Sequence, residues 1–308
     1  MSTSIVTVTH NSSDVIGDML RSLPAEVEVV LVDNASSDDV AATARAVRPD
    51  TVVIELTTNI GFGGGCNVGA RRATGDVVIF LNPDCRPQPG AIETLSARAS
   101  EDPTSIFGPA LLDADGTLRS NLRRASRPYH EILEGLPSAA RWVPIRWRRD
   151  LPADDPRYRD GGQVDYLQGA CLAIARERFL LVGGFDEDFF LYSEEETLCL
   201  AVRARGGSCV YVPEVAVSHT EGTSTTAVRA FALRHLFRSR AIFYRKRYGE
   251  LRGLLAIIAI ASVMAVSWML HPVAVALRMH ASQRPQVERY ALAGLFEGAI
   301  HRFGRLGP

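Results

Sequence analysis

The chain has 308 residues, of which 46% are hydrophobic and 22% charged, and its formal net charge at pH 7 is -1. This composition is ordinary for a folded protein that buries a core, and the nearly neutral charge gives no reason to expect nucleic acid as a partner. The five cysteines form no C-x-x-C pair, which argues against a zinc site and predicts reduced thiols in the cytosol. A strand pattern that begins at Ile5 leaves no room for a signal peptide.

The first hundred residues alternate between strand and helix patterns. Strands are predicted at 5–9, 27–32, 52–56 and 77–81, and helices at about 14–23, 38–47 and 64–74. Such alternation predicts an α/β fold with a parallel sheet. Ligands of open α/β sheets bind beyond the carboxyl ends of the strands. The polar residues that follow these strands are therefore candidate site residues: Thr9, Asn11, Asp33, Asn59, Asn82 and Asp84.

Asp84 follows the most apolar of these strands, and Pro83 ends that strand because proline has no N–H to donate. A carboxylate at this place suits a hard divalent cation such as Mg²⁺, which fills its other positions with phosphate oxygens. Alternatively, Asp84 caps the next helix, since Asp near Pro and Gly is common turn chemistry. This stretch alone leaves both interpretations open.

Five glycines lie within residues 61–69. They either let a helix N-terminus face an anion or allow tight packing of that helix on the sheet. The spacing does not fit the dinucleotide-binding pattern G-x-G-x-x-G, because Cys66 occupies the third glycine position, and the absence of G-K-[ST] excludes a P-loop.

The later part of the chain has two regular stretches and one irregular one. Residues 109–119 predict a hairpin with an Asp-Gly turn, whereas 120–162 lose periodicity and predict a long loop. Ser193 is a candidate N-cap of a helix that runs to about Arg205. Glu194 and Glu195 would complement the dipole of that helix. The aromatic run before them also suits a general base in water-poor surroundings.

The order and spacing of these motifs resemble the family 2 glycosyltransferases of the GT-A fold, and within them the bacterial cell-wall rhamnosyltransferases that use dTDP-rhamnose. The resemblance covers residues 4–222 and rests on Asp33-Asn34-Ala35-Ser36, Asn59-x-Gly61-Phe62-Gly63 with Asn67, Asn82-Pro83-Asp84, Gly183–Glu187 with Phe189-Phe190, and His219-x-x-Gly222. It implies a Rossmann-like, mostly parallel sheet flanked by helices.

The resemblance also implies roles for individual residues. Asp33 would bond the pyrimidine edge of the nucleotide. Asp84, with Asn in place of the family's first Asp, would bind Mg²⁺ or Mn²⁺, and His219 would reach the diphosphate or the metal. Glu195 would be the general base, with Glu194 as the open alternative because the second acid of the pair is usually Asp. The donor site would be lined by Thr9, Asn11, Asn59, Gly61, Gly63, Asn67 and Asn82, and the acceptor site by Asp165, Gln168, Gly169 and Asp186. Thr197 stands where many relatives carry Asp.

The C-terminal third combines charge and hydrophobicity. Residues 234–252 hold seven Arg or Lys against one acid, with interleaved aromatic residues, and 253–270 form an uncharged run of 18 residues. Such a run is about 27 Å long as a helix, just short of the ~30 Å hydrocarbon core of a bilayer. We expect an interfacial or re-entrant membrane anchor. A buried helix of a homodimer is the alternative.

The expected organisation is a GT-A domain over 1–225, with a nucleotide-binding half at 1–105 and an acceptor-binding half at 106–225. A helical, membrane-associating region would follow at 226–308. The expected activity is inverting transfer of L-rhamnose from dTDP-L-rhamnose to polyprenyl-diphosphate-linked N-acetylglucosamine, at the inner face of the cytoplasmic membrane. Transfer of another hexose or galactofuranose is an alternative. A nucleotidyltransferase would need Arg and Lys in a glycine-rich loop after the first strand. A non-catalytic sugar-nucleotide-binding protein would not need the two glutamates.

Overall fold

The computed structural model describes residues 2–119, 122–134, 143–220, 226–276 and 284–303, and only the backbone of 134, 145, 226–229, 270–276 and 284–288. The chain divides into two compact units. The first comprises 1–124, 150–187 and 194–222, and the second comprises 125–149, 188–193 and 223–308. This division differs from the expected boundary at residue 225, because 125–149 and 188–193 group with the C-terminal helices.

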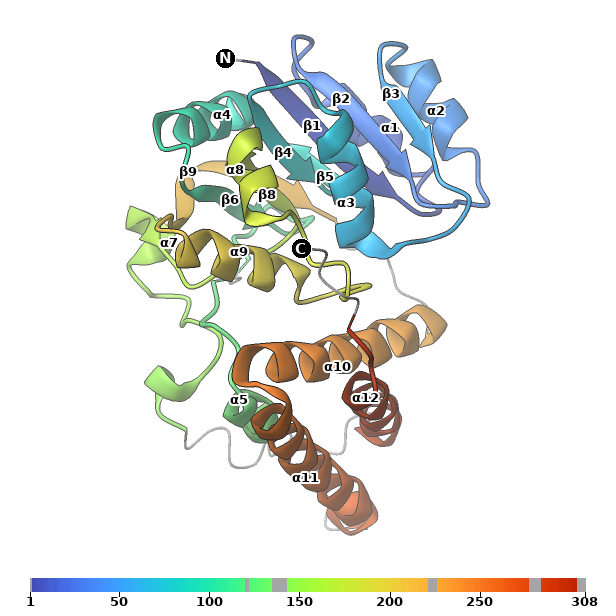
Figure 1. The fold of residues 1–308 in the computed structure, drawn as a ribbon, viewed down its shortest axis with the longest axis vertical. Helices are drawn as coiled ribbons and strands as arrows, with labels where there is room; N and C mark the ends of the chain where they lie inside the picture. The colour runs from blue at the N-terminus through green and yellow to red at the C-terminus, as the bar shows by residue number, and fades with distance from the viewer. Residues whose placement is uncertain (1, 120–121, 135–142, 221–225, 277–283, 304–308) are drawn as a thin grey trace. The chain divides into compact units, whose positions relative to one another are not determined.

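The first unit is built on a mixed sheet that has nine strands among the described residues, in the order β3-β2-β1-β4-β8-β6-β9-β5 with β7 beside β9 (Figure 1). The strands are β1 Thr3–Thr9, β2 Glu28–Asp33, β3 Val52–Glu55, β4 Val77–Leu81, β5 Cys85–Pro87, β6 Ile106–Leu112, β7 Gly162–Gln163, β8 Cys171–Ala175 and β9 Cys209–His219. Strands β3, β2, β1 and β4 are parallel to one another, while β8 is antiparallel to both β4 and β6. The expected α/β fold is confirmed.

The parallel register explains why the site lies at one edge of the sheet. Thr9 pairs with Asp33, and Asp33 pairs with Glu55, so β1, β2 and β3 end side by side. Strand β4 is parallel to β1 and ends at Leu81. The polar residues that follow these strands therefore meet at the carboxyl edge, as the sequence predicted.

Alternate side chains of these strands enter two apolar clusters, one on each face of the sheet. Val6, Val30 and Val78 belong to one cluster, and their neighbours Ile5, Val29 and Ile79 to the other. Helices cover both faces, which is why the strands read as continuous apolar runs. The helices of this unit are α1 Ile16–Arg21, α2 Val40–Val47, α3 Gly61–Arg72, α4 Ala91–Glu101, α7 Arg157–Asp160, α8 Arg176–Val182 and α9 Glu194–Ala204.

Helix α3 begins at Gly61, so the glycine run lies inside the helix. A Cβ on Gly65 would lie 2.7 Å from Cγ1 of Val8, and a Cβ on Gly69 would lie 2.4 Å from Cγ1 of Val6. No real Cβ has room at such distances. Tight packing on β1 therefore explains these two glycines.

The hairpin expected at 109–119 is present in outline. Strand β6 leads into a turn in which Asp113 N–H donates to Thr117 O at 2.9 Å, and Leu112 bridges Leu118. Gly116 supplies the left-handed backbone that the turn requires, with φ +82°.

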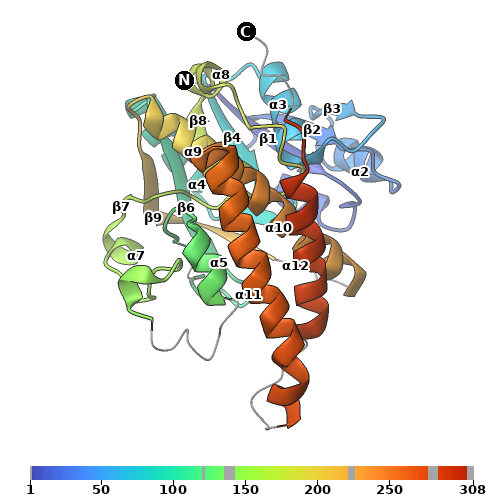
Figure 2. The same cartoon turned by 60° about the horizontal axis from the view of Figure 1, so that its bottom comes forward.

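The second unit is helical and holds α5 Pro128–Glu134, the 3₁₀ turn η1 Ile145–Trp147, α10 Thr226–Tyr248, α11 Glu250–Ala276 and α12 Arg284–Ala299. Its α-helices are labelled in Figure 2. The long loop expected at 120–162 is thus wrong in its described part, which holds α5, η1 and α7. Tertiary contacts stabilise α5. Its buried Glu131 accepts a hydrogen bond from Tyr244 Oη at 2.7 Å and pairs with Arg240 at 3.4 Å.

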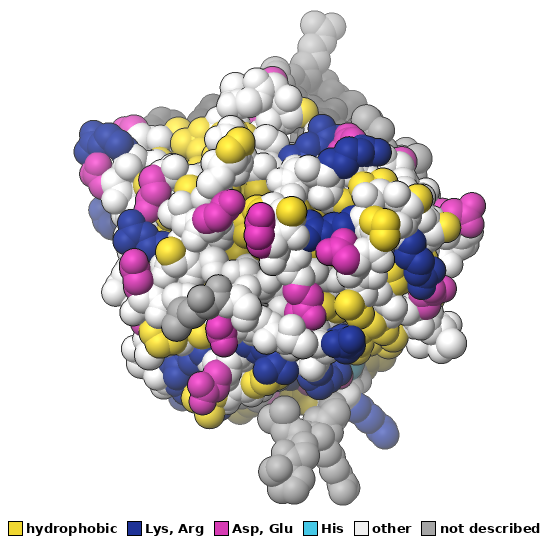
Figure 3. All heavy atoms as spheres, turned by 90° about the horizontal axis from the view of Figure 1, so that it is seen from above, with side chains coloured by type: hydrophobic (Ala, Val, Ile, Leu, Met, Phe, Trp, Pro, Cys, Tyr) yellow, Lys and Arg dark blue, Asp and Glu magenta, His cyan; other side chains and the backbone are white. Residues whose placement is uncertain are grey.

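Helix α11 has two apolar faces. Ile257, Ile260 and Met264 are buried, whereas the side chains of another face are exposed: Leu251, Leu255, Ile258, Val266 and Met269. Among the described residues, one helical segment, Glu250–Met269, is both long enough and apolar enough to cross a membrane. Acidic and basic side chains are interspersed across the described part of the face drawn in Figure 3. The exposed face of α11, by contrast, carries large apolar side chains.

Candidate functional site

The ends of β1 and β2 form one end of the site. Thr9 is buried, and its Oγ1 donates to Val32 O at 3.4 Å. Asp33 is also buried, and its Oδ1 accepts from Ser36 N–H at 2.9 Å. Asn34 belongs to the motif quoted for the resemblance, but no role of its own was assigned to it from the sequence. Its amide bonds Gly61 O at 3.0 Å and Ile60 N–H at 2.9 Å, so it fastens the end of β2 to the start of α3.

Two further predicted residues shape the neighbouring loops. Asn11 has φ +55°, and its Oδ1 accepts from Ser37 N–H at 2.8 Å. Asn59 accepts from Gly61 N–H at 3.0 Å, immediately before α3 begins. Both residues lie at the carboxyl edge of the sheet with Thr9 and Asp33.

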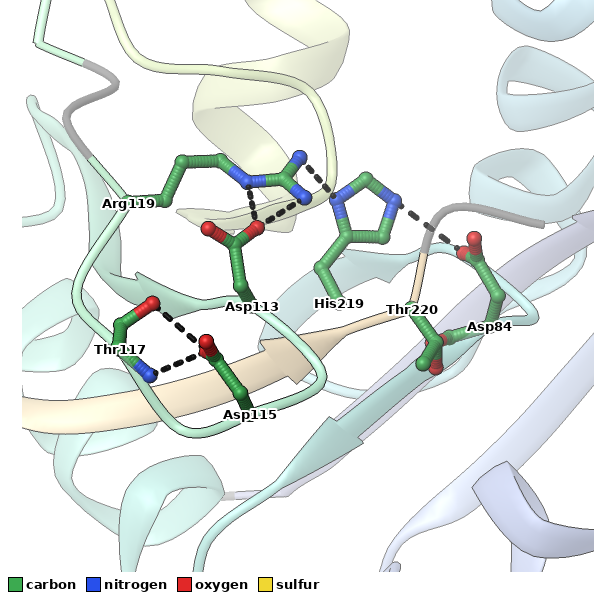
Figure 4. Close-up of polar contacts among 7 residues, drawn as sticks. All are labelled: Asp84, Asp113, Asp115, Thr117, Arg119, His219 and Thr220. Atoms are coloured by element: carbon green, nitrogen blue, oxygen red, sulfur yellow. Dashed lines mark hydrogen bonds and ion pairs between the residues drawn. The ribbon is translucent and has the colours of Figure 1, made fainter. Parts of the chain in front are cut away.

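Asp84 lies at the start of a strand. The next element is β5, and the N-cap of the following helix α4 is Gly90. The helix-cap interpretation of Asp84 is therefore wrong. Strand β5 pairs with β9 so that Cys85 faces His219, and this brings His219 Nε2 within 3.3 Å of Asp84 Oδ1 (Figure 4).

Arg119 continues this cluster and was not singled out in the sequence. Its Nη1 donates to His219 Nδ1 at 3.4 Å, and its Nε donates to Asp113 Oδ1 at 2.8 Å. The turn of the hairpin is shaped separately by Asp115, which accepts from Thr117 N–H at 2.9 Å. Figure 4 shows the resulting chain of side chains, from Asp113 through Arg119 and His219 to Asp84.

The cluster fits a divalent cation. Single ligand atoms of Asp84, Cys85 and His219 lie within 4.8 Å of one another. Burial raises the pKa of the Cys85 thiol well above its usual range, and the nearby Asp84 carboxylate raises it further. A sulfur ligand is in addition a poor match for a hard ion such as Mg²⁺. One carboxylate and one imidazole remain for Mn²⁺ or Mg²⁺, together with phosphate or water oxygens.

The two glutamates begin helix α9 behind an unusual backbone. Tyr192 and Ser193 have φ values of +68° and +71°, in the left-handed region that non-glycine residues rarely adopt. Helix α9 begins at Glu194, so Ser193 is at the predicted N-cap position, although its backbone is left-handed and not extended as in a typical N-cap. Strained residues of this kind cluster at functional sites, where the surrounding structure fixes them.

Glu194 and Glu195 face different surroundings. Glu194 is 4% exposed, and a Cβ on Gly63 of α3 would lie 3.5 Å from its Cβ. Glu195 is half-buried, and a Cβ on Gly169 would lie 3.5 Å from its Cβ. Only the second glutamate is therefore partly open to solvent, at a segment that was predicted to bind the acceptor.

The comparisons with known proteins identify the chain. The model of a family described as glycosyl transferase family 2 matches residues 4–172. The chain belongs to this family. It is 29% identical over 283 residues to the N-acetylglucosaminyl-diphospho-decaprenol L-rhamnosyltransferase of Mycobacterium tuberculosis, covering 82% of this chain and 90% of that protein. It is 26% identical over 219 residues to a low-salt glycan biosynthesis hexosyltransferase of Haloferax volcanii, covering 69% of this chain and 66% of that protein.

Solved structures show the same fold at lower identity. A mannosyltransferase from Pyrobaculum calidifontis in complex with GDP-Man and Mn²⁺ has a TM-score of 0.57 at 18% identity, over 97% of this chain and 87% of that one. Staphylococcus aureus TarS in complex with UDP has a TM-score of 0.54 at 15% identity, over 97% and 82%. The glycosyltransferase therefore has the GT-A fold.

Asn67 has a supporting place in this glycosyltransferase. We expected it in the donor site. Its amide donates to Phe185 O at 2.8 Å and to Glu187 Oε1 at 2.9 Å, and accepts from Phe185 N–H at 2.8 Å. Asn67 thus joins α3 to the loop 183–187, and no local sequence signal could reveal this contact between residues 118 positions apart.

The remaining predicted residues are distributed over the same unit. Asn82 is half-buried, and its N–H donates to Ala170 O at 2.9 Å. Asp165 is half-buried, and its backbone oxygen accepts from Arg203 at 3.1 Å. Gln168 and Asp186 are half-buried as well.

Proposed function

We propose that this glycosyltransferase moves L-rhamnose from dTDP-L-rhamnose to N-acetylglucosamine on a polyprenyl diphosphate, with inversion at the anomeric carbon. The observation that carries the proposal is the similarity to the M. tuberculosis L-rhamnosyltransferase, which extends over 82% of this chain and 90% of that protein. Transfer of another hexose is the second candidate, favoured by the similarity to the hexosyltransferase of H. volcanii.

The donor nucleotide would bind where β1 and β2 end. Asp33 accepts hydrogen bonds only, so its carboxylate suits the N3–H of thymine or uracil. One oxygen of Asp33 already accepts from Ser36 N–H, which orients the carboxylate. Thr9 and Asn59 lie at the same edge of the sheet, with the start of α3 at Gly61.

Asp84 and His219 would hold a divalent cation against the donor diphosphate. When bound, the cation would supply positive charge to the leaving diphosphate, and at an effective dielectric near 20 one charge pair at 4 Å is worth about 4 kcal/mol. The pairing of β5 with β9 places Nε2 of the His219 imidazole 3.3 Å from Oδ1 of the Asp84 carboxylate.

Glu195 would take the proton from the acceptor hydroxyl. A base must reach the reacting proton, and Glu195 is half-buried beside Gly169, whereas Glu194 is 4% exposed against α3. In an inverting transfer the acceptor oxygen attacks while the diphosphate leaves from the opposite face. Glu194 would then serve mainly to position the start of α9.

Helix α11 would lie against the membrane that carries the lipid-linked acceptor. One face of α11 packs within the second unit, and the exposed face carries large apolar side chains such as Leu255 and Ile258. Arg247 and Arg252 are exposed near its start, where they can meet anionic lipid head groups. Because one face of the helix is already covered, we favour interfacial contact over a separate transmembrane span.

The test is product analysis by the purified full-length protein. The donors are dTDP-L-rhamnose, UDP-glucose, UDP-galactofuranose and GDP-mannose, and the acceptor is polyprenyl-diphosphate-N-acetylglucosamine in detergent. The proposal predicts a product with one added deoxyhexose from dTDP-L-rhamnose and at most trace products from the others. A hexose added at a higher rate would establish the second candidate instead.

A further inference from the structure

Three rings of the second unit form an aromatic cluster. Phe231 and His235 lie one turn apart on α10, with ring centroids 4.2 Å from each other. Phe190 packs against both, and its centroid lies 4.8 Å from that of His235 and 6.2 Å from that of Phe231. Phe231 is 49% exposed, so the cluster presents an aromatic surface to solvent. The roles proposed above do not use any of these three residues.

The loop that carries Phe190 is fastened to α10 on both sides of that residue. Before it, Asp188 pairs with Lys246 at 2.5 Å, and after it, the oxygen of Leu191 accepts from Ser239 Oγ at 2.7 Å. One face of α10 provides Ser239 and both helical rings of the cluster, because these positions follow one another at intervals of four residues. These contacts hold Phe190 in place against that face.

The groups beside the cluster are mostly positive. Burial lowers the pKa of His235, Arg238 and Arg234 lower it further, and Glu297 acts in the opposite direction. The imidazole is therefore neutral at pH 7 and adds to the apolar surface. Arg234 pairs with Glu297, and Nη2 of Arg238 lies 3.2 Å from Nδ1 of His301. Among these groups, two guanidinium charges stand against one carboxylate.

The cluster is also close along the chain to the proposed general base. Phe190 precedes Glu195 by five residues, and five residues span at most about 18 Å. In the proposed acceptor, a sugar and a diphosphate separate the reacting hydroxyl from the first isoprene unit. That separation is of the same order, so the isoprenoid chain begins within reach of the cluster.

The chemistry of the cluster suits an isoprenoid chain better than a sugar. Sugar hydroxyls need hydrogen-bond partners, and the only ones that the three rings carry are the imidazole nitrogens of His235, of which Nδ1 is buried. An isoprenoid chain is apolar and gains by covering exposed aromatic surface. The guanidinium groups beside the cluster suit the diphosphate at the start of that chain.

We propose that Phe190, Phe231 and His235 form the subsite for the first isoprene units of the lipid-linked acceptor. The chain covers the exposed ring of Phe231. This inference rests on the proposed function, which supplies the polyprenyl diphosphate acceptor. It is distinct from the membrane contact of α11, because the subsite holds one acceptor molecule and not the bilayer.

The test compares two water-soluble acceptors that differ only in their apolar part: N-acetylglucosamine diphosphate esterified with farnesol and the same diphosphate esterified with methanol. In the full-length protein, Phe231→Ala should raise KM for the farnesyl acceptor about fivefold to thirtyfold, because apolar contact with the chain is lost. Its kcat should stay at the wild-type value, because the lost contact is equal in the ground and transition states. Its KM for the methyl acceptor and its affinity for dTDP should not change. A purely structural role would alter these values too.

Two further variants complete the test. Phe231→Leu keeps an apolar side chain, so its KM for the farnesyl acceptor should return to within about threefold of the wild-type value. Phe296→Ala removes another exposed aromatic side chain of the second unit, on α12, which is 66% exposed. Its KM for both acceptors should match the wild type.

The outcomes separate this inference from the proposed function. If the wild type transfers rhamnose but Phe231→Ala leaves KM for the farnesyl acceptor unchanged, or raises KM for both acceptors equally, the subsite is wrong and the proposed function stands. Unchanged KM values together with weaker vesicle binding, or with loss of a dimer, would assign the cluster to the bilayer or to a second copy of the chain and overturn the subsite. If the wild type transfers rhamnose to neither these acceptors nor the polyprenyl-linked one, the proposed function fails and the subsite falls with it.

Discussion

The two compact units of this glycosyltransferase differ in the side chains that mark their candidate functions. The first unit buries polar groups such as Asp33 and His219 at the edge of its sheet and gives each of them a defined partner. The second unit exposes large apolar groups such as Leu255 and Ile258 on α11. Buried polar groups that are fully bonded are rigid, whereas exposed apolar surface favours a non-aqueous partner. The contrast supports the proposal that the first unit carries the chemistry and the second contacts the membrane.

The largest effect is expected when the proposed cation ligand, Asp84, is removed. Asp84→Ala should lower the transfer rate by at least about 10³-fold, because about 4 kcal/mol of electrostatic stabilisation is lost. The unfolding midpoint should not change, since Asp84 follows β4 and is half-buried. Steady-state rates at saturating Mn²⁺ check this expectation.

Asp115→Ala is the matched control for that variant. Asp115 lies in the neighbouring hairpin, is exposed and accepts only from Thr117 among the bonds drawn in Figure 4. Its rate should stay near the wild-type value. If Asp84→Ala kept most of the wild-type activity, the cation site would lie elsewhere.

The glutamates test the other half of the site. Glu195→Gln should lower kcat by about 10²–10⁴-fold with little change in donor affinity, because the general base is lost. Glu194→Gln should act mainly on stability or acceptor KM, because that side chain is 4% exposed. Glu195→Asp should keep substantial activity. An inactive Glu194→Gln beside an active Glu195→Gln would reverse the assignment.

The second unit is probed on the exposed face of α11. The double variant Leu255→Ser, Ile258→Ser removes side chains that are 58% and 60% exposed. Its partition onto anionic vesicles should weaken about hundredfold, at roughly 1.5 kcal/mol for each apolar side chain. Sedimentation with vesicles measures this effect.

Leu181→Ser on α8 of the first unit is the control, because Leu181 is 63% exposed and should not contact lipid. Equal losses of binding in the control and in the α11 variant would contradict membrane contact by α11.

The smallest expected effect concerns the nucleobase. Asp33→Asn should lower the affinity for dTDP by roughly tenfold, because one charge-assisted hydrogen bond to the base is lost. CDP should bind the wild type less well than dTDP, since cytosine has no N3–H to donate. For the same reason, Asp33→Asn should lower the affinity for CDP less than the affinity for dTDP. Equal wild-type affinities for CDP and dTDP would refute the role of Asp33.

The sequence predicted the first half of the fold well and the later contacts less well. Strand β4 was placed at Val77–Leu81, as observed, because the apolar run of this buried strand ends at Leu81, just before Asn82 and Pro83. The site residues that directly follow strands could be predicted for the same reason, since parallel strands share an edge. Family resemblance was needed to select His219.

Contacts made across the sheet could not be predicted. Arg119 meets His219 only because β9 pairs with β5 and with β6, and a sequence without an alignment does not reveal such pairings. Helix α5 escaped prediction because its stability comes from Tyr244 and Arg240, more than a hundred residues later. The different burial of Glu194 and Glu195 likewise depends on α3.

The division of roles between the units is tested most directly by rates on two acceptors. One acceptor is the polyprenyl-linked substrate in vesicles, and the other is a water-soluble analogue with a short isoprenoid chain. The α11 variant Leu255→Ser, Ile258→Ser should keep the wild-type rate on the soluble acceptor and lose about tenfold or more on vesicles, while Asp84→Ala should lose both activities. Equal losses by the α11 variant on the two acceptors would contradict the account.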